Sequence, residues 1–333
     1  MKTLDVKETI VNGEKEGHLY YEASHGTLVH DVVIDAGIGD EVLIGHISDI
    51  HYNLCNKQDF LEADPVTMST LWHRLWLAGG KSVQLGRCCF DLLDDVDQMV
   101  FNGDTMDYLS HGCMELMQME VWDRFPDAIA TVGGHELSRR MQGKVADPMT
   151  YAERFEIIKN FWKHDAYYVS RLLKNKVLVV GLCNDLWTLN EYQRECLKRD
   201  IATARENGYI MLLFMHEPIC TRNPAHTCIN TDSPEVLLLG DASGFPKDLC
   251  SGNTRGNPIV GCDRCDEVTN DVYREIVNNA DIIRGVFAGH YHSEMYVEIL
   301  AKNGDGTPAI IPQYVKTASA YGESGGMMRI LVK

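Results

Sequence analysis

Five short clusters of acidic and histidine residues occur along this sequence, and their side chains suit metal-dependent chemistry. They are, in chain order, Asp49-Ile50-His51, Gly103-Asp104-Thr105-Met106-Asp107, Gly133-Gly134-His135-Glu136, Met215-His216-Glu217 and Gly289-His290-Tyr291-His292. Imidazole and carboxylate together suit borderline divalent ions such as Mn, Fe, Zn and Co, whereas Mg and Ca favour oxygen ligands. Two such ions about 3.5–4 Å apart, bridged by one carboxylate, can grip a phosphoryl group and activate water. These residue types therefore predict a two-metal site.

Each cluster alone is weak evidence for such a site. A Gly-Asp pair is common in turns, and a lone histidine after a strand is more often a hydrogen-bonded residue than a ligand. The pair His290 and His292 is more informative, because residues two apart in a strand point to the same face. The presence of all five clusters in one chain, each after an apolar run, favours the metal site.

The apolar runs along the chain predict the strands that must position these clusters. The runs are Glu41 to Ile47, Gln98 to Phe101, Ala128 to Val132, Lys176 to Leu182, Tyr209 to Met215 and Ile282 to Ala288. Short β-branched runs that alternate with helical stretches are typical of an α/β fold. Because polar groups gather beyond the carboxyl ends of such strands, we expect the clusters to form one site.

Helical spacing and further strands complete the expected architecture. Apolar residues recur at helical spacing in three segments: Pro65 to Ala78 after Asp64, Met149 to Trp162, and Leu189 to Glu206. The last of these follows Thr188 as its expected cap and stops at Asn207-Gly208. The tail from Ala309 to Lys333 predicts further strands, broken by a turn at Gly322 to Gly326.

Taken in order, the five clusters resemble the calcineurin-like metallophosphoesterase family. Its pattern is D-x-H, G-D-x-x-(D/N), G-N-H-(D/E), a later H, and G-H-x-H, and the match spans about residues 44 to 295. The resemblance implies a four-layer α/β/β/α sandwich of two mixed β-sheets. It also implies that residues 1–333 form a single domain, with residues 1–40 as an N-terminal strand extension.

The resemblance also implies a role for each matching residue and two divalent metal ions, with Mn, Fe or Zn expected. The first ion would be held by Asp49, His51 and His292, Asp104 would bridge, and the second ion would be held by His216 and His290. His135 would touch the phosphate and protonate the leaving oxygen. A metal-bridging hydroxide would attack phosphorus in line. The expected catalytic residues are Asp104, which would bridge the two ions, and His135, which would protonate the leaving oxygen.

One position departs from the family's pattern. Gly134 stands where the family has an asparagine whose carbonyl completes the second metal site, and glycine has no side chain to offer. The second metal could bind more weakly and still suffice, the chain could be a pseudoenzyme, or Gly134 could be an engineered change. We expect a hydrolase of phosphomonoesters or phosphodiesters; the alternative is a metal-binding pseudoenzyme that recognises a phosphorylated ligand or partner.

Residues next to the expected ligands are candidates for supporting them. Asp107 either orients ligands by hydrogen bonds or caps the helix that follows. Glu136 and Glu217 each either orient the neighbouring histidine or face solvent, and Tyr52 and Asn53 are expected to line the mouth of the site.

The segment 220–267 lacks sustained periodicity, is rich in cysteine, and is expected to be an irregular insertion near the active site. Its cysteines are Cys220, Cys228, Cys250, Cys262 and Cys265. They could hold a structural zinc ion, form a disulfide or remain free thiols. The segment could instead contact the substrate, with Arg222, Arg255 and Arg264 as candidate clamps for a phosphate or a carboxylate. Arg139 and Arg140, just after the His135 cluster, are further candidates.

Charge and composition limit the partners. The formal net charge of -17 would repel nucleic acid duplexes and anionic membranes, so we expect a small-molecule phosphate ester as substrate. No apolar run reaches the roughly 20 residues that span a bilayer, and no secretory signal is evident. The eleven cysteines are an odd number and mostly scattered, as in a reducing compartment. A soluble, cytoplasmic protein is therefore the default expectation.

Overall fold

The structure is a computed structural model, and it divides into two compact units. It describes residues 5–11, 27–62, 81–91, 93, 95–137, 149–184, 189–220, 238–240, 267–290, 292, 295–316 and 326–333. The first unit comprises Met1–Ala166 with Lys316–Lys333, and the second comprises Tyr167–Val315. Each unit is built on one six-stranded sheet.

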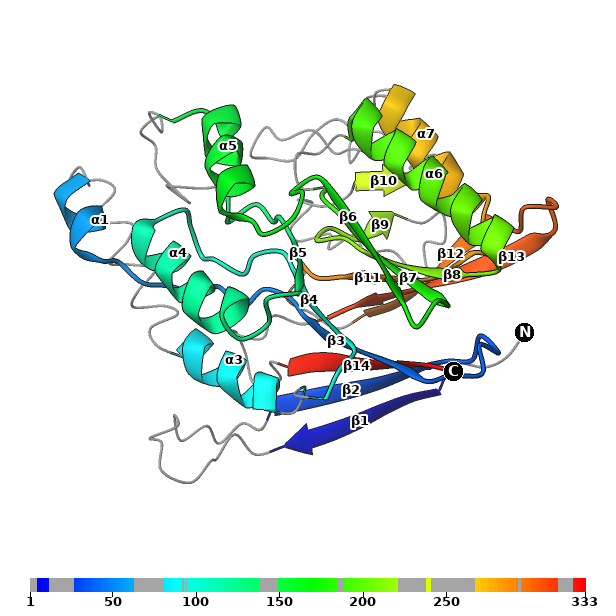
Figure 1. Cartoon of the computed structure of the whole chain (residues 1–333), viewed down its shortest axis with the longest axis horizontal. Coiled ribbons are helices and arrows are strands. Elements are labelled where there is room, and N and C mark those ends of the chain that lie inside the picture. The colour runs from blue at the N-terminus through cyan, green and yellow to red at the C-terminus, as the bar shows by residue number, and fades with distance from the viewer. Residues whose placement is uncertain are drawn as a thin grey trace, which may run out of the picture. The chain divides into compact units, whose positions relative to one another are not determined.

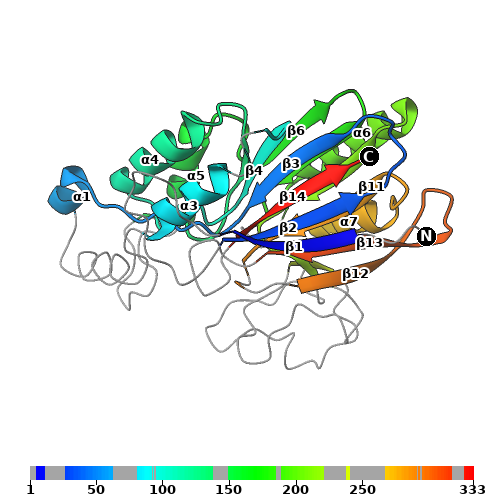
Figure 2. The same cartoon turned by 90° about the horizontal axis from the view of Figure 1, so that it is seen from below.

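The sheet of the first unit is mixed (Figures 1 and 2). Its order is β1 (Asp5–Val11), β2 (Thr27–Ile34), β14 (Gly326–Val332), β3 (Val42–Ile47), β4 (Gln98–Asn102) and β5 (Ile129–Thr131). β1 pairs with β2 and β14 with β3 in antiparallel fashion, whereas β2 with β14, β3 with β4 and β4 with β5 are parallel. The carboxyl ends of β3, β4 and β5 therefore lie at the same edge of this sheet.

The central strands of this sheet are apolar because they are buried. Every residue of β4 and β5 is buried, as are all but one of β3, which explains their nearly continuous apolar sequence. The helix α3 (Lys81–Asp91) contacts β2 and β14. Its Phe90 ring packs edge-on against Phe101 of β4 at a centroid distance of 5.7 Å.

The described residues of the first unit form four further helical segments. They are α1 (Lys57–Glu62), α4 (His111–Met117), the π-helical turn η1 (Gln118–Trp122) and α5 (Tyr151–Phe161). Thr150 and Glu153 form a capping box at the start of α5, which confirms the helix expected at Met149 to Trp162. The expected helix from Pro65 to Ala78 lies outside the described residues.

The sheet of the second unit is also mixed. Its order is β12 (Met295–Lys302), β13 (Pro308–Val315), β11 (Ile283–Ala288), β8 (Ile210–Phe214), β7 (Val177–Leu182) and β6 (Tyr168–Leu173). The four inner strands are parallel, and the edge strands β12 and β6 are antiparallel to their neighbours. Two short parallel strands, β9 (Ile219–Cys220) and β10 (Leu238–Gly240), form a separate pair.

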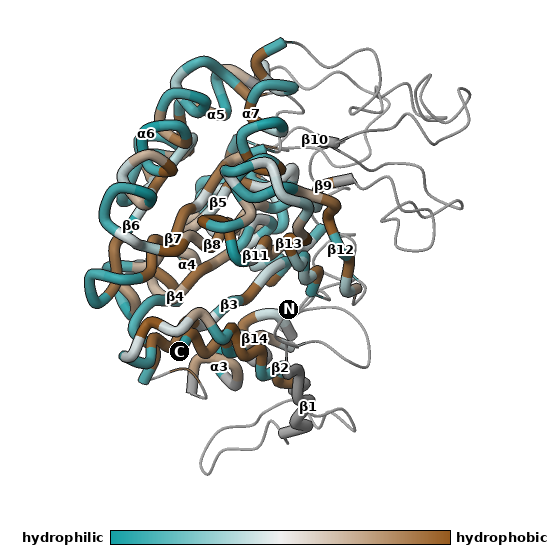
Figure 3. Tube along the Cα trace, turned by 90° about the vertical axis from the view of Figure 1, so that its right-hand side faces the viewer, coloured by the Kyte–Doolittle hydropathy of each residue, from teal (hydrophilic) through white to brown (hydrophobic). Residues whose placement is uncertain are grey.

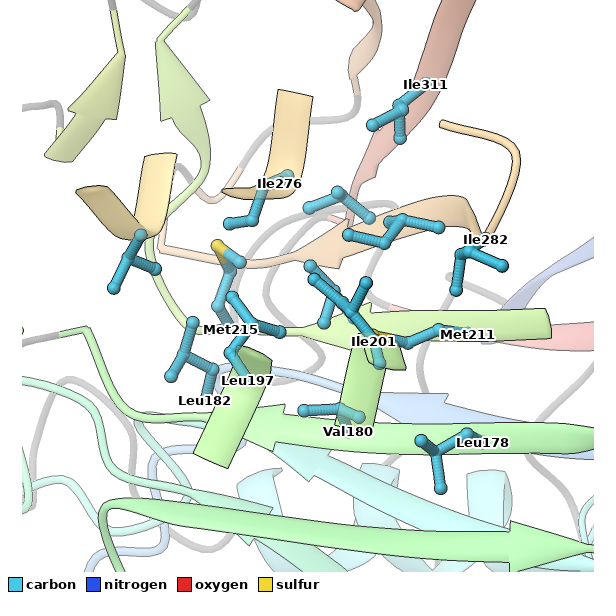
Figure 4. Packing of buried hydrophobic residues seen from close by; sticks show 14 of the residues in the cluster. Leu178, Val180, Leu182, Leu197, Ile201, Met211, Met215, Ile276, Ile282 and Ile311 are labelled. Carbon is cyan, nitrogen blue, oxygen red and sulfur yellow. The ribbon is translucent and has the colours of Figure 1, made fainter. Parts of the chain in front are cut away.

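Two amphipathic helices cover one face of this sheet. Leu197 and Ile201 of α6 (Glu191–Asn207) and Ile276 of α7 (Glu267–Val277) pack with strand residues such as Val180 and Met211 in one core cluster (Figure 4). Figure 3 shows the contrast between the apolar strands β7 and β8 and the largely polar α6.

The start of α6 differs from the sequence expectation. Thr188, the expected cap, lies outside the described residues, and Asn190 caps the helix by accepting from the N–H of Gln193. Asparagine is a strong cap because its side-chain carbonyl reaches the third helical N–H. The expected end is confirmed, since Gly208 adopts the left-handed conformation that closes α6.

The expected fold class is confirmed, because both units combine a mixed sheet with helices. The six apolar runs form β3, β4, β5, β7, β8 and β11. Most of the segment 220–267 lies outside the described residues. Within the described part of the chain, none of the helices has both the length and the apolar content that crossing a bilayer requires.

Candidate metal centre

In the first unit, the chain segments that follow β3 and β4 run side by side. Backbone hydrogen bonds join Asp49 N to Gly103 O at 3.0 Å and His51 N to Asp104 O at 2.9 Å. Two more bonds continue the pairing, from Tyr52 N to Thr105 O and from Asp107 N to Tyr52 O. The first two clusters of the sequence are therefore held together by main-chain bonds before any side chain is considered.

The expected ligands share an unusual backbone conformation. Seven non-glycine residues among those described have positive φ, and five of them are expected metal ligands: Asp49 (54°), His51 (54°), Asp104 (49°), His290 (69°) and His292 (51°). The other two, Lys174 and Asn175, form the turn between β6 and β7. Left-handed conformation strains residues that carry a Cβ, and such strain gathers at functional sites.

Three of the expected ligands in the first unit lie close together. Asp49, His51 and Asp104 each place one ligand atom within 4.8 Å of the others. Asp49 and His51 are completely buried and Asp104 nearly so. The Ser48 hydroxyl donates to the Asp49 carboxylate. Buried carboxylates beside an imidazole form a donor set that suits a divalent cation.

Asp107 supports the histidines rather than the following helix. Its Oδ1 lies 3.1 Å from His51 Nδ1 and 3.2 Å from His135 Nδ1. Its Oδ2 accepts from Asn53 Nδ2 at 2.6 Å. The helix that follows, α4, is capped by Ser110 instead. Because a carboxylate can only accept, this contact places the His51 proton on Nδ1 and leaves Nε2 as the ligand atom.

Burial keeps the His51 ring neutral. Burial, with a smaller contribution from the nearby His135, lowers the pKa of His51 to about 4. Neutral imidazole is the form that binds a metal ion. His51 is therefore ready to act as a ligand at neutral pH.

His135 lies at the centre of this group. Its backbone N–H donates to Asp104 Oδ1 at 2.9 Å, and its ring packs edge-on against His51 with centroids 4.4 Å apart. Its Nδ1 lies 2.8 Å from the Asp107 carbonyl oxygen, which can only accept, so this nitrogen carries a proton. Its Nε2 lies 3.8 Å from Asp104 Oδ2. The ring is therefore oriented with Nε2 toward the carboxylate of the expected bridging ligand.

Glu136 anchors the loop that carries Asp104. Its completely buried carboxylate accepts three backbone N–H groups, from Asp104 at 3.0 Å, Met106 at 2.9 Å and Gly133 at 2.8 Å. The alternative that Glu136 faces solvent is wrong, because its side chain is completely buried. It fixes main-chain atoms on both sides of the expected bridging ligand.

The two glycines before His135 contribute in different ways. A Cβ on Gly133 would lie 2.3 Å from Asp104 Oδ1, so this close approach requires glycine. Gly134 begins a turn in which Leu137 N donates to Gly134 O at 3.2 Å. It offers only main-chain atoms, so the asparagine oxygen of the family's pattern has no counterpart at this position.

Tyr52 and Asn53 do not line a mouth, and this expectation is wrong. Tyr52 is completely buried, and a Cβ on Gly86 of α3 would lie 3.0 Å from its hydroxyl oxygen. Asn53 is 5% exposed and joins Asp107 to the hydroxyl of Tyr108.

In the second unit, His216 and His290 lie together after β8 and β11. His290 Nδ1 is 3.3 Å from His216 Nε2, and Gly289 N donates to His216 O at 3.0 Å. Two nitrogens bound to one ion at roughly 2.0–2.1 Å with tetrahedral geometry would lie about 3.4 Å apart. The pair thus has the spacing that a shared cation requires. His292 is exposed.

Sequence reasoning missed a buried amide beside His216. Asn184 follows β7 and bonds to both main-chain polar groups of Glu217. Glu217 itself is 1% exposed, so it does not face solvent. No sequence signal marked Asn184, because a lone asparagine after a strand is common.

Several other candidate residues lie outside the described part of the chain. The cysteines beyond Cys220 in the segment 220–267 lie outside the described residues, as do Arg139, Arg140, Arg222, Arg255 and Arg264. The zinc, disulfide and phosphate-binding hypotheses for them stay predictions. Cys220 itself belongs to β9.

No protein-family model and no curated protein sequence matches the chain. Among solved structures it is similar to a purple acid phosphatase from yellow lupin (Lupinus luteus) seeds, with TM-score 0.45 and 10% identity over 87% of this chain and 46% of that one. It is also similar to a dimetal phosphatase from Danio rerio (TM-score 0.39, 11% identity, 83% and 87%). A third is PhoD (TM-score 0.44, 9% identity, 89% and 60%). This chain spans less than half of the lupin protein. Because these similarities are weak, we argue the function of this protein from its own residues.

Proposed function

We propose that this protein is a metal-dependent hydrolase of phosphate esters. The proposed ligands of two divalent ions are Asp49, His51, Asp104, His216, His290 and His292, with Asp104 as the bridging carboxylate. The observation that carries the proposal is the left-handed backbone at five of these residues. Strain of about 1–2 kcal/mol per residue is retained only where the arrangement is needed.

The donor set fits divalent ions of the borderline class. Carboxylate oxygens and neutral imidazole nitrogens suit Mn, Fe or Zn better than Mg or Ca. When bound, two such ions supply Lewis-acid polarisation of the phosphate and of water. The buried position of Asp49, His51 and His216 supports this reading, because each places its ligand atoms away from bulk solvent.

The protein's own contribution to proton transfer centres on His135. Asp107 holds Nδ1 of this ring through its main-chain carbonyl and its carboxylate. A second proton on the ring therefore resides on Nε2, the atom that faces Asp104. His135 is 15% exposed, so a substrate oxygen can reach it. We assign it the role of general acid toward the leaving oxygen.

Gly134 supports a second candidate function. Its missing side chain leaves one expected ligand of the second ion without a protein donor, and a weakly filled second position would produce a metal-binding protein that recognises a phosphorylated ligand without hydrolysing it. The intact remainder of the ligand set favours the hydrolase, because a lost function would leave the other ligands free to change.

The test is Mn-dependent hydrolysis of an aryl phosphate monoester and diester by the parent and by Gly134→Asn. We expect the parent to hydrolyse at least one ester and the variant to do so at lower metal concentration. Activity in Gly134→Asn alone would identify Gly134 as a disabling residue. Inactivity of both proteins with both esters would refute the hydrolase and favour the binding protein.

A further inference from the structure

The main chain at His216, a proposed metal ligand, lies beyond the end of the pairing between β7 and β8. The pairing of β7 with β8 ends at Gly181 and Phe214, two residues before His216. On the β11 side the chain is still held, because Met215 N donates to Phe287 O at 3.1 Å and Gly289 N donates to His216 O at 3.0 Å. On the β7 side, the strand ladder no longer reaches the segment.

Asn184 replaces the missing ladder on that side. Its Nδ2 donates to Glu217 O at 2.7 Å, and its Oδ1 accepts from Glu217 N at 3.1 Å. Asn184 is 1% exposed and Glu217 equally so, which shields both bonds from water. One side chain thus satisfies the donor and the acceptor of the residue that follows the ligand.

These bonds limit how the His216 ring can move. Glu217 is fixed by Asn184, and the His216 carbonyl is fixed by Gly289. Gly289 directly precedes His290, the residue whose Nδ1 lies 3.3 Å from His216 Nε2. Rotation of the main chain at Glu217 would therefore change the separation of the two ring nitrogens.

We propose that Asn184 is a positioning residue that sets the spacing of His216 and His290 for one metal ion. The inference rests on the proposed function, because it concerns the same ion. It also specifies the residue type. A side-chain amide offers a donor and an acceptor in one rigid plane, whereas an ionised aspartate at this position would face the Glu217 carbonyl with a second oxygen.

The second unit provides a matched control. Gln313 of β13 bonds in the same way to both main-chain groups of Ile219, at 2.7 Å and 2.9 Å. It is completely buried. Gln313→Glu therefore makes the same chemical change as Asn184→Asp. The residue that Gln313 binds, Ile219, is not a chain neighbour of a proposed ligand, whereas Glu217 directly follows His216.

The experiment compares the parent, Asn184→Asp and Gln313→Glu by calorimetric titration of the metal-free proteins with Mn²⁺ and Zn²⁺. We expect Asn184→Asp to bind one of two ions roughly 10–100-fold more weakly, and Gln313→Glu to stay within about 3-fold of the parent. A second readout needs no metal. Hydrogen exchange at the Glu217 amide should accelerate at least about 10-fold in Asn184→Ala, which removes the acceptor of this N–H, whereas Asn184→Asp keeps an acceptor oxygen there.

The outcomes separate the two proposals. A parent that binds two ions, with Asn184→Asp weakened no more than Gln313→Glu, overturns the positioning role alone. A parent that binds no ion overturns the proposed function and this inference with it. If the new buried carboxylates prevent folding, Asn184→Ala and Gln313→Ala remove both bonds of each amide without adding a charge, and the same comparison decides.

Discussion

Glu136→Gln tests whether a buried carboxylate outside the ligand set controls the expected bridging ligand. In the native protein, Oε2 accepts from Asp104 N and Gly133 N, and Oε1 accepts from Met106 N. Glutamine has the same shape but only one acceptor oxygen. Its least costly orientation keeps the two bonds of Oε2 and turns an NH₂ group toward the Met106 N–H.

The cost follows from these three bonds. A buried N–H left without an acceptor costs about 1–3 kcal/mol. The two retained bonds lose their charge assistance, which is worth roughly 1 kcal/mol each. Burying a neutral amide is easier than burying a carboxylate, which offsets part of the loss. We expect a net decrease of about 3 kcal/mol in the free energy of unfolding, or roughly 6–12 °C in Tm.

Asp59→Asn is the matched control for this variant. The Asp59 carboxylate also accepts three backbone N–H groups, from Asn56, His111 and Gly112, at 2.8–2.9 Å. None of its donors is a proposed ligand. We expect both variants to lose similar stability in thermal unfolding of the metal-free protein, and only Glu136→Gln to bind Mn²⁺ roughly 10–100-fold more weakly in calorimetry. Equal metal affinity in the two variants would refute the reasoning.

Three further predictions concern strain, burial and close packing. His292→Gly should stabilise the metal-free protein to urea by about 1 kcal/mol, because an exposed residue with φ of 51° loses its Cβ strain, and should weaken metal binding; lower stability would contradict the strain. Gly133→Ala should cost at least about 3 kcal/mol in urea unfolding, because its Cβ would lie 2.3 Å from Asp104 Oδ1; a neutral effect would contradict the required glycine. Burial, with a smaller effect of Lys316, lowers the pKa of His46 to about 3. The unfolded chain therefore takes up this proton first, so stability is full above about pH 6.5 and falls by about 1.4 kcal/mol per pH unit toward pH 3. His46→Leu should flatten this part of the stability profile, and an unchanged slope would exclude His46 as its source.

The strands that carry the site were predictable because both of their faces are buried. Runs such as Lys176 to Leu182 and Tyr209 to Met215 have nearly uninterrupted apolar sequence, and they form β7 and β8. The strands β6 and β12 were not predicted. Both lie at sheet edges, where polar residues such as Ser170, Arg171 and Glu298 interrupt the apolar pattern.

Within the site, the sequence identified the proposed metal ligands better than the residues that hold them in place. The residue types of the proposed ligands carry their own signal, because Asp and His clusters after apolar runs are unusual. Hydrogen-bond partners carry no such signal. The contacts of Glu136 with three backbone N–H groups and of Asn184 with Glu217 depend on which loops lie side by side. Tyr52 was misplaced because its neighbour His51 suggested a position at the mouth of the site, whereas the Tyr52 side chain is completely buried.

The most direct test of the central claim is to count the metal ions bound to the parent, to His51→Ala and to His290→Ala after loading with Mn²⁺ or Zn²⁺. Mass spectrometry of the native proteins and elemental analysis supply the count. We predict two ions per chain in the parent and one fewer in each variant, because the two histidines are assigned to different ions. A parent that binds no ion, or variants that retain both, would contradict the account.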